Sequence, residues 1–337
     1  RKWDNAIHWF KQVDPYKLSQ TENHDYTFKY GYALFEIESF EEASQKFFSI
    51  KDVDNAYAAP AQYYFAHIAY QDEQNQTALE AFQKLEGHEQ FGPVVPFYIS
   101  QLLYKQKKFD ELIEYAPPLL ENNNTKRAEE ISRLIGESYY GKQQYAEAIP
   151  FLEYFQEKTR NNSAQDRYQL AYCYYQVGDY EKAIQSFAKL SGYEDELGQT
   201  SLYQLADCYL KSNEKASARN AFLETYKMGY DERLTQDALF NYAKLSYELQ
   251  FDPYNKAIKA FNRFIEEYPN SPRLDEAYNY LTNLYLTSKS YDDALASIEK
   301  ISKLDIKLQQ AYQTIAYNKG IEDFQNRNLE TAIAYLE

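Results

Sequence analysis

Glycine, proline and cysteine are scarce in this chain of 337 residues, which contains 10 Gly, 10 Pro and 2 Cys. Valine and threonine, two residues that favour strands, are sparse as well. A fold built from β-strands needs many turns and many β-branched residues. The composition therefore argues against extended β structure and favours an all-α fold.

Long apolar runs and positive charge are also lacking. No segment reaches the roughly 18 apolar residues that a membrane-spanning helix needs. The 36 Lys and Arg residues are outnumbered by 51 Asp and Glu, which gives a formal net charge of −15. Because an acidic surface repels phosphate groups and anionic lipid headgroups, we expect no nucleic acid partner and no binding to a membrane surface.

Sequence motifs of enzymes are missing too. The four histidines have no spacing typical of a zinc site, and the chain has no HExxH, no G-x-G-x-x-G and no P-loop. We therefore predict a protein that is not an enzyme, with no catalytic residues, no metal and no cofactor.

Aromatic residues are abundant instead, with 36 Tyr and 20 Phe, and they recur in a helical pattern. The stretch from Leu170 to Leu190 shows the basic unit, which is two amphipathic helices joined by a tight turn. Gly178 can adopt the left-handed conformation that ends the first helix, and Asp179 can cap the second. Such a hairpin has one apolar side that it cannot bury alone.

The rest of the chain repeats this hairpin with a period of about 35 residues, which is typical of a solenoid. Cys173 and Cys208 occupy the same position in adjacent copies, so we expect both to be buried and about 10 Å apart, too far for a disulfide. A weaker copy contains Leu112 and Ala116. The second helix of the other copies is marked by a small residue followed four places later by a large apolar one, at Ala6/Phe10, Ala43/Phe47, Ala78/Phe82, Ala148/Leu152, Ala183/Phe187, Ala218/Phe222, Ala257/Phe261, Ala294/Ile298 and Ala332/Leu336.

These repeats resemble the tetratricopeptide repeat (TPR), and the resemblance covers essentially the whole chain. It implies an all-α, right-handed α-solenoid of about nine helix-turn-helix units, the first and last incomplete. In the family pattern a large apolar residue directly precedes the small residue in the middle of the first helix. The last copy has Lys319 at that position instead. The small residue itself recurs at Gly31, Ala66, Ser100, Gly136, Ala171, Ala206, Ala243, Thr282 and Gly320.

We expect residues 1–337 to form a single TPR solenoid, as a fragment of a longer chain, because the sequence opens and closes inside repeats. Pro117 and Pro118 fall inside what should be a second helix, and a polar run follows at 121–126. A joint is therefore possible near 117–127, dividing 1–116 from 128–337. Residues 15–24 are expected to form a polar connector.

The resemblance also implies an inner surface, lined by the first helices, that holds a peptide or a partner helix. Tyrosine offers a large contact area at low entropic cost and a hydroxyl for hydrogen bonding. The same rings could instead pack between neighbouring repeats, and His67 is expected to be a polar contact rather than a catalyst. Helical phase gives these candidate partner-binding residues: Tyr32, Phe35, Tyr63, His67, Tyr70, Tyr104, Tyr140, Tyr168, Tyr172, Tyr175, Tyr203, Asp207 and Tyr247.

The predicted function is a scaffold or adaptor that binds another protein or a peptide in an aromatic-lined concave groove. Two alternatives remain open: a glycan- or peptidoglycan-associated binding module, or the regulatory array of an enzyme whose catalytic part lies outside this fragment. The segment Tyr268 to Pro272 (YPNSP) also resembles repeats of bacterial periplasmic TPR proteins that work at the outer membrane. This likeness favours a bacterial source and a periplasmic or outer-membrane-associated location over a cytoplasmic one.

Overall fold

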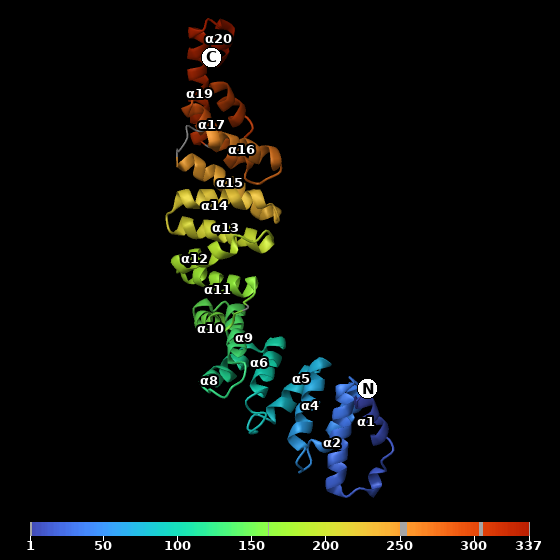
Figure 1. Cartoon of the computed structure of the whole chain (residues 1–337). Helices are drawn as coiled ribbons and strands as arrows, with labels where there is room; N and C mark the ends of the chain where they lie inside the picture. The colour runs from blue at the N-terminus through green and yellow to red at the C-terminus, as the bar shows by residue number, and fades with distance from the viewer. Residues whose placement is uncertain (1, 161, 250–254, 303–305, 337) are drawn as a thin grey trace. The chain divides into compact units, whose positions relative to one another are not determined.

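The computed structural model describes residues 2–160, 162–249, 255–302 and 306–336, which form helices joined by short turns (Figure 1). No strand occurs within these ranges. The chain divides into two compact units, Arg1–Asn162 and Ser163–Glu337. Within each unit every helix packs against the next one along the chain, so the predicted all-helical array of helix pairs is confirmed.

Unit 1 contains the helices α1 to α10. It opens with α1 (Lys2–Phe10) and a short 3-10 helix, η1 (Pro15–Lys17). The pairs that follow are α2 (Gln20–Glu36) with α3 (Phe40–Ile50), α4 (Ala58–Gln71) with α5 (Asn75–Gln83), α6 (Val95–Lys105) with α7 (Phe109–Tyr115) and the short α8 (Pro117–Leu120), and α9 (Ala128–Gly141) with α10 (Tyr145–Lys158).

Unit 2 consists of helix pairs from α11 to α20. These are α11 (Ala164–Val177) with α12 (Tyr180–Leu190), α13 (Glu196–Lys211) with α14 (Lys215–Met228), α15 (Glu232–Glu248) with α16 (Asn255–Glu267), α17 (Leu274–Thr287) with α18 (Tyr291–Ile298), and α19 (Ile306–Gln325) with α20 (Leu329–Leu336). Successive first helices also touch one another from α11 to α17.

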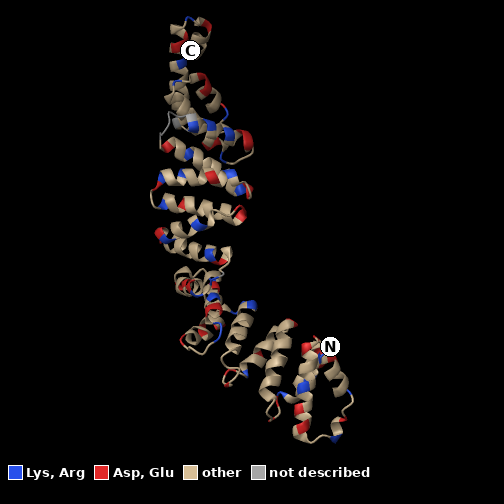
Figure 2. Cartoon of the chain, in the orientation of Figure 1, with Lys and Arg blue, Asp and Glu red and all other residues tan. Residues whose placement is uncertain are grey.

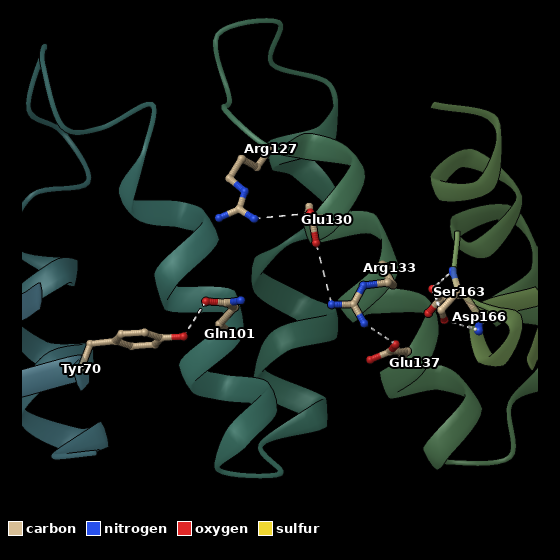
Figure 3. A network of polar contacts seen from close by, with 8 residues as sticks. All are labelled: Tyr70, Gln101, Arg127, Glu130, Arg133, Glu137, Ser163 and Asp166. Carbon is tan, nitrogen blue, oxygen red and sulfur yellow. Dashed lines mark hydrogen bonds and ion pairs between the residues drawn. The ribbon is translucent and has the colours of Figure 1, made fainter. Parts of the chain in front are cut away.

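The hairpin α11–α12 has the termini that the sequence predicts. Gly178 ends α11 with φ +83°, in the left-handed region that glycine adopts without strain. The Asp179 carboxylate then accepts a hydrogen bond from the backbone N–H of Lys182 and caps α12. At the start of α11, Ser163 and Asp166 form a reciprocal capping box, which is drawn in Figure 3.

The core of each unit lies where a small residue of one helix meets a large apolar residue of its partner. Gly31 shows how close this approach is, because a Cβ added there would lie 3.1 Å from the Phe47 ring. At Gly136 an added Cβ would lie 2.7 Å from the Leu152 side chain. All nine small residues of the first helices are buried, so these positions are needed for helix contact rather than for chain flexibility.

The ends of the array differ from its interior. The large apolar marker residues from Phe47 to Ile298 are buried, with at most 1% of their surface exposed. At the C-terminal pair the equivalent Leu336 is 45% exposed, and Phe10 of α1 is partly exposed. The interior residues are covered by a following helix pair, which accounts for the difference.

Two local predictions can be compared directly with the helix bounds. The connector expected over 15–24 is shorter, because Ser19 and Glu22 form a capping box and α2 already begins at Gln20. The interruption expected at Pro117 is confirmed, since α7 ends at Tyr115 and α8 begins at Pro117.

The segment 117–127 lies inside unit 1, where α9 packs against α6, α7 and α8. The joint expected in this segment stays a prediction. Cys173 and Cys208 are buried free thiols, as expected, and burial raises the pKa of each to about 12.

Candidate functional site

The thirteen candidate residues all lie on first helices and all are half-buried. Seven belong to unit 1, on α2, α4, α6 and α9, and six belong to unit 2, on α11, α13 and α15. We call the surface on which they lie the first-helix face of each unit. What matters for function is what each side chain contacts within its own unit.

In unit 1 the candidates on α2 and α4 are part of a continuous group of aromatic rings. Tyr32 and Phe35 both pack edge-on against Tyr64, with ring centroids 5.4 and 5.1 Å apart. His67 packs against Phe35 and against Tyr98, at 6.0 and 5.7 Å. Such tilted and edge-to-face pairs are favourable beyond the area they bury. We refer to Tyr32, Phe35, Tyr64, His67, Tyr70 and Tyr98 as the ring cluster.

His67 lies at the centre of the ring cluster. Its neighbours are Tyr63, Tyr70 and Tyr98 on α4 and α6, together with Phe35 on α2. The Nδ1 atom is buried without a hydrogen-bond partner. Burial among these rings lowers the pKa of His67 below its ordinary value, because the charged imidazolium loses its hydration. The side chain therefore packs in surroundings that favour the neutral imidazole over the charged form.

The C-terminal part of the unit 1 face is polar (Figure 3). The Tyr70 hydroxyl donates a 2.8 Å hydrogen bond to Gln101 Oε1, which links α4 to α6. Arg127, directly before α9, and three residues on α9, Glu130, Arg133 and Glu137, form a chain of ion pairs with N–O distances of 3.3, 3.8 and 2.7 Å. Because the positive and negative groups alternate, most of the charge on α9 is balanced within the helix.

In unit 2 two candidate tyrosines bind carboxylates of the next first helix. Tyr175 on α11 donates to Asp207 Oδ2 on α13, and Tyr203 on α13 donates to Asp237 Oδ2 on α15, at 2.5 and 2.6 Å. Burial, followed by the hydrogen bond to the carboxylate, raises the pKa of both phenols above the ordinary value. Tyr247 contacts the ring of Tyr280 on α17, at 5.2 Å.

A common rule connects these contacts. A residue late in one first helix contacts a residue near the middle of the next first helix, 31 to 33 positions later in sequence. Burial and contact with Glu137 raise the pKa of Tyr104 to about 12, which adds a member of this series. The pairs are Phe35 with His67, Tyr70 with Gln101, Tyr104 with Glu137, and Tyr175 with Asp207. Many candidate side chains therefore join neighbouring helix pairs and are only half-buried there.

An arginine strengthens this junction in both units. The Arg127 guanidinium lies 3.6 Å from the Phe97 ring centroid in unit 1, and that of Arg273 lies 3.5 Å from the Phe240 ring in unit 2. Each arginine directly precedes a first helix, α9 or α17, and stacks on the preceding one. Arg273 also binds Asp237, with 2.6 Å between Nη1 and Oδ1. Arginine suits this place because its flat, weakly hydrated group can stack and form ion pairs at once.

Lys319 departs from the repeat pattern for a reason that the structure shows. It lies among three carboxylates, with Nζ 2.9 Å from Asp292, 3.3 Å from Asp323 and 3.6 Å from Glu322. Hydrogen bonds to Asp292 and Asp323 raise the pKa of Lys319, although burial opposes this shift. The cation therefore replaces an apolar contact between α18 and α19 with an ionic one. It lines a pocket of 550 Å³ that also includes Arg327.

Sequence reasoning missed the residues that connect the candidates. Tyr64 and Tyr98 occupy one repeat position, two residues before the small residues Ala66 and Ser100, and form much of the ring cluster. Asp25 and Asp237 share one repeat position, three residues before Phe28 and Phe240, and each accepts a hydrogen bond from a tyrosine. An acidic residue recurring at that position was the available signal for the carboxylates.

Two kinds of feature are absent from the described part of the chain. Within it, no helix combines the length and the apolar composition that crossing a bilayer requires. No group of His, Cys, Asp and Glu side chains there has an arrangement that could hold a metal ion.

Comparison with known proteins gives two family matches. The family model for subunit 3 of the anaphase-promoting complex, or cyclosome, matches residues 141–225, and the tetratricopeptide-repeat model matches residues 237–271. No curated protein sequence matches the chain.

Several solved structures are similar. A tetratricopeptide repeat protein from Parabacteroides merdae is 13% identical, with 87% of this chain and 98% of that chain covered and a TM-score of 0.43. YrrB, described as a TPR protein with an unusual peptide-binding site, is 16% identical over 63% of this chain and 100% of its own, with a TM-score of 0.45. MamA is 19% identical over 52% of this chain and 95% of its own, with a TM-score of 0.40. With identities this low and TM-scores below 0.5, these similarities do not identify a function for this chain.

The family matches agree with what the helices themselves show. Pairs of helices recur along both units, and a small residue of each first helix meets a large residue of its partner. This chain is therefore a tetratricopeptide-repeat protein, a member of a family whose helix arrays serve as scaffolds for protein interactions.

Proposed function

We propose that the protein is an adaptor that binds an extended or helical segment of a partner protein on the first-helix face of unit 1. The observation that carries this proposal is the ring cluster. Three successive first helices, α2, α4 and α6, each contribute half-buried rings to it. Half-buried tyrosines supply contact area without loose side chains, which is the property of residues that dominate protein interfaces.

The polar groups beside the ring cluster supply specificity. Gln101 and Tyr70 are already bonded to each other, and Lys105 lies over the Tyr70 ring at 5.2 Å. Because these contacts fix the side chains before a partner arrives, less entropy is lost when it binds. A partner segment would lay apolar side chains on the rings and place its backbone or polar groups against Gln101 and Lys105.

A selection experiment tests the proposal. Peptides are selected from a random display library against the full chain, and their affinities are measured by fluorescence anisotropy. We expect Phe35→Ser to weaken the selected peptides by about tenfold or more, since Phe35 contacts Tyr64 and His67. The matched control is Phe48→Ser, a change of the same residue type on the second helix α3, where the ring is 61% exposed.

Circular dichroism establishes that both variants remain helical. Equal affinities for the wild type and the Phe35 variant, or an equal loss in both variants, would show that the peptides bind away from the first-helix face. That result would contradict the proposal.

A further inference from the structure

A second surface, within unit 2, has features of a binding site. A pocket of 200 Å³ lies among α14, α15 and α16 of unit 2. Its apolar part includes Leu239, which is 2% exposed. We call it the basic pocket, after the polar residues around it, which are Tyr226, Tyr242, Lys256, Lys259 and Arg263.

The charge of the basic pocket is opposite to that of the chain. The chain carries a net charge of −15, and Figure 2 shows Asp and Glu along helices of both units. The basic pocket is lined instead by Lys256, Lys259 and Arg263, whose spacing of three and four residues puts them on one side of α16. Another pocket of unit 2 is lined instead by the carboxylates of Asp195 and Glu196. A concentration of cations in one place of an acidic protein produces a local positive potential.

Two of these cations, Lys259 and Arg263, are only partly balanced by the protein itself. The carboxylate nearest Arg263 is that of Glu267, with 3.9 Å between Nε and Oε1. The Tyr226 hydroxyl also donates to the Glu267 carboxylate, 2.9 and 3.0 Å from its two oxygens, so Arg263 shares this carboxylate with Tyr226. Within the part of the chain that the structure describes, Lys259 takes part in no ion pair. Lys259 and Arg263 can therefore still form ion pairs with the negative groups of a ligand.

The size of the basic pocket limits what it can hold. Sites that enclose small-molecule ligands usually measure about 300–1,000 Å³. A pocket of 200 Å³ instead suits one large apolar side chain, with the rest of the ligand lying on the surface around it. The tyrosines Tyr226 and Tyr242 offer flat walls for such a side chain.

From charge and size together, we propose that the basic pocket binds a short acidic segment of a partner protein. One large apolar side chain of the segment lies against Leu239, and carboxylates on either side of it pair with Lys259 and Arg263. Nucleic acid also carries negative charge, but the surrounding acidic surface repels a long phosphate backbone while it admits a short peptide. The proposal does not depend on the first-helix face of unit 1, because it uses different residues and a different unit.

A peptide array tests this assignment with the full chain. The probes are short peptides with a central Leu or Phe flanked by Asp and Glu, together with matched peptides that have a central Ser or flanking Lys residues. We expect retention of the acidic, apolar-centred peptides, with a loss of about tenfold for Lys259→Glu and for Arg263→Glu. The matched control is Lys189→Glu, an exposed lysine of the second helix α12 in the same unit, which should bind like the wild type.

Each outcome decides the matter. Failure to retain any acidic, apolar-centred peptide would overturn the proposal, and so would equal retention by the Lys259 and Lys189 variants. Equal binding of peptides with central Ser would reduce the site to unspecific charge attraction. Tighter binding of a single-stranded oligonucleotide, measured by anisotropy, would point to nucleic acid instead. Because Lys259 is exposed, its reversal should leave the helical circular dichroism signal intact.

Discussion

Units 1 and 2 join their helix pairs at equivalent positions but with different chemistry. In unit 1 the contact between first helices is mainly ring against ring, as in Phe35 with His67. In unit 2 a phenol bonded to a carboxylate joins α11 to α13 and α13 to α15, as in Tyr203 with Asp237. Both units use a guanidinium stacked on a buried Phe ring. The repeat therefore fixes where neighbouring pairs meet, while the choice of side chain fixes how they hold together.

The difference matters because the two kinds of contact respond to different changes. Ring packing depends on shape and buried area, so it is sensitive to lost volume. A hydrogen bond to a carboxylate depends on one atom and its charge, so it is sensitive to a lost hydroxyl. Four experiments, ordered by the size of the expected effect, would break or sharpen this comparison.

The largest effect is expected from removing a ring of the unit 1 core. Phe82 is fully buried and stacks on Tyr98 at 4.9 Å, with Tyr63 at 6.1 Å. Phe82→Ala should lower the free energy of unfolding by about 3–5 kcal/mol through lost transfer energy and a cavity. Hydrogen exchange should speed up in α4, α5 and α6, whereas Phe48→Ala, at an exposed ring, should change little. If hydrogen exchange in α6 were unchanged, the stacking of Phe82 on Tyr98 would not couple the stability of the two neighbouring helix pairs.

A somewhat smaller effect is expected from overfilling a helix crossing in unit 2. Ala183 is fully buried on α12, and a leucine there has no free volume to occupy. Ala183→Leu should cost about 1–3 kcal/mol in the free energy of unfolding. Ala188→Leu, on the exposed side of the same helix, is the control and should be close to neutral. Thermal unfolding measured for both variants distinguishes crowding at the crossing from a general effect of leucine on α12.

Removing single hydroxyls compares the two units directly. Tyr203→Phe deletes a bond to the Asp237 carboxylate, and Tyr70→Phe deletes one to the neutral Gln101 amide. We expect losses of about 1–2 kcal/mol and about 0.5–1 kcal/mol, because hydrogen bonds to charged groups contribute more. Both losses in the free energy of unfolding are measured by urea unfolding, with hydrogen exchange as the readout for each unit. A larger loss for Tyr70→Phe would reverse the contrast drawn between the units.

The smallest effect is a pH dependence confined to unit 1. Burial lowers the pKa of His67 below its ordinary 6.5, so below that pH the folded protein binds fewer protons than the unfolded chain. Stability from this residue is therefore present above about pH 6.5 and is lost as the pH falls. Hydrogen exchange of α4 should be faster at pH 5 than at pH 7 after correction for intrinsic rates. His67→Gln should abolish this difference between pH 5 and pH 7. The control His8→Gln, at an exposed residue of α1, should retain it.

The sequence predicted the helix pairs well because their signals are local. The left-handed Gly178, the capping Asp179 and the buried Ala183 each act within one hairpin, and all three are confirmed. The start of α2 was predicted less well. A capping box at Ser19 and Glu22 extends that helix toward the N-terminus, and a polar composition had hidden it.

The candidate site was predicted only in part. Phase placed Tyr70, Tyr175 and Tyr203 on first helices correctly, but it did not identify their partners. Gln101, Asp207 and Asp237 follow more than thirty residues later, and no local pattern links the two members of each pair. Whether the candidate residues bind a partner protein stays a prediction, as do the compartment and the bacterial source.

What the sequence determined by itself was the period, the helix pairs and the small residues at their crossings, since these depend on spacing within one or two helices. Only the tertiary structure decided which rings meet, that Lys319 is held by three carboxylates, and that α16 turns three cations toward one pocket. The physical reason is the separation of the contacting residues in sequence. Stacking of the repeats brings together residues that lie a whole repeat apart, so their pairing follows from helix packing rather than from sequence proximity.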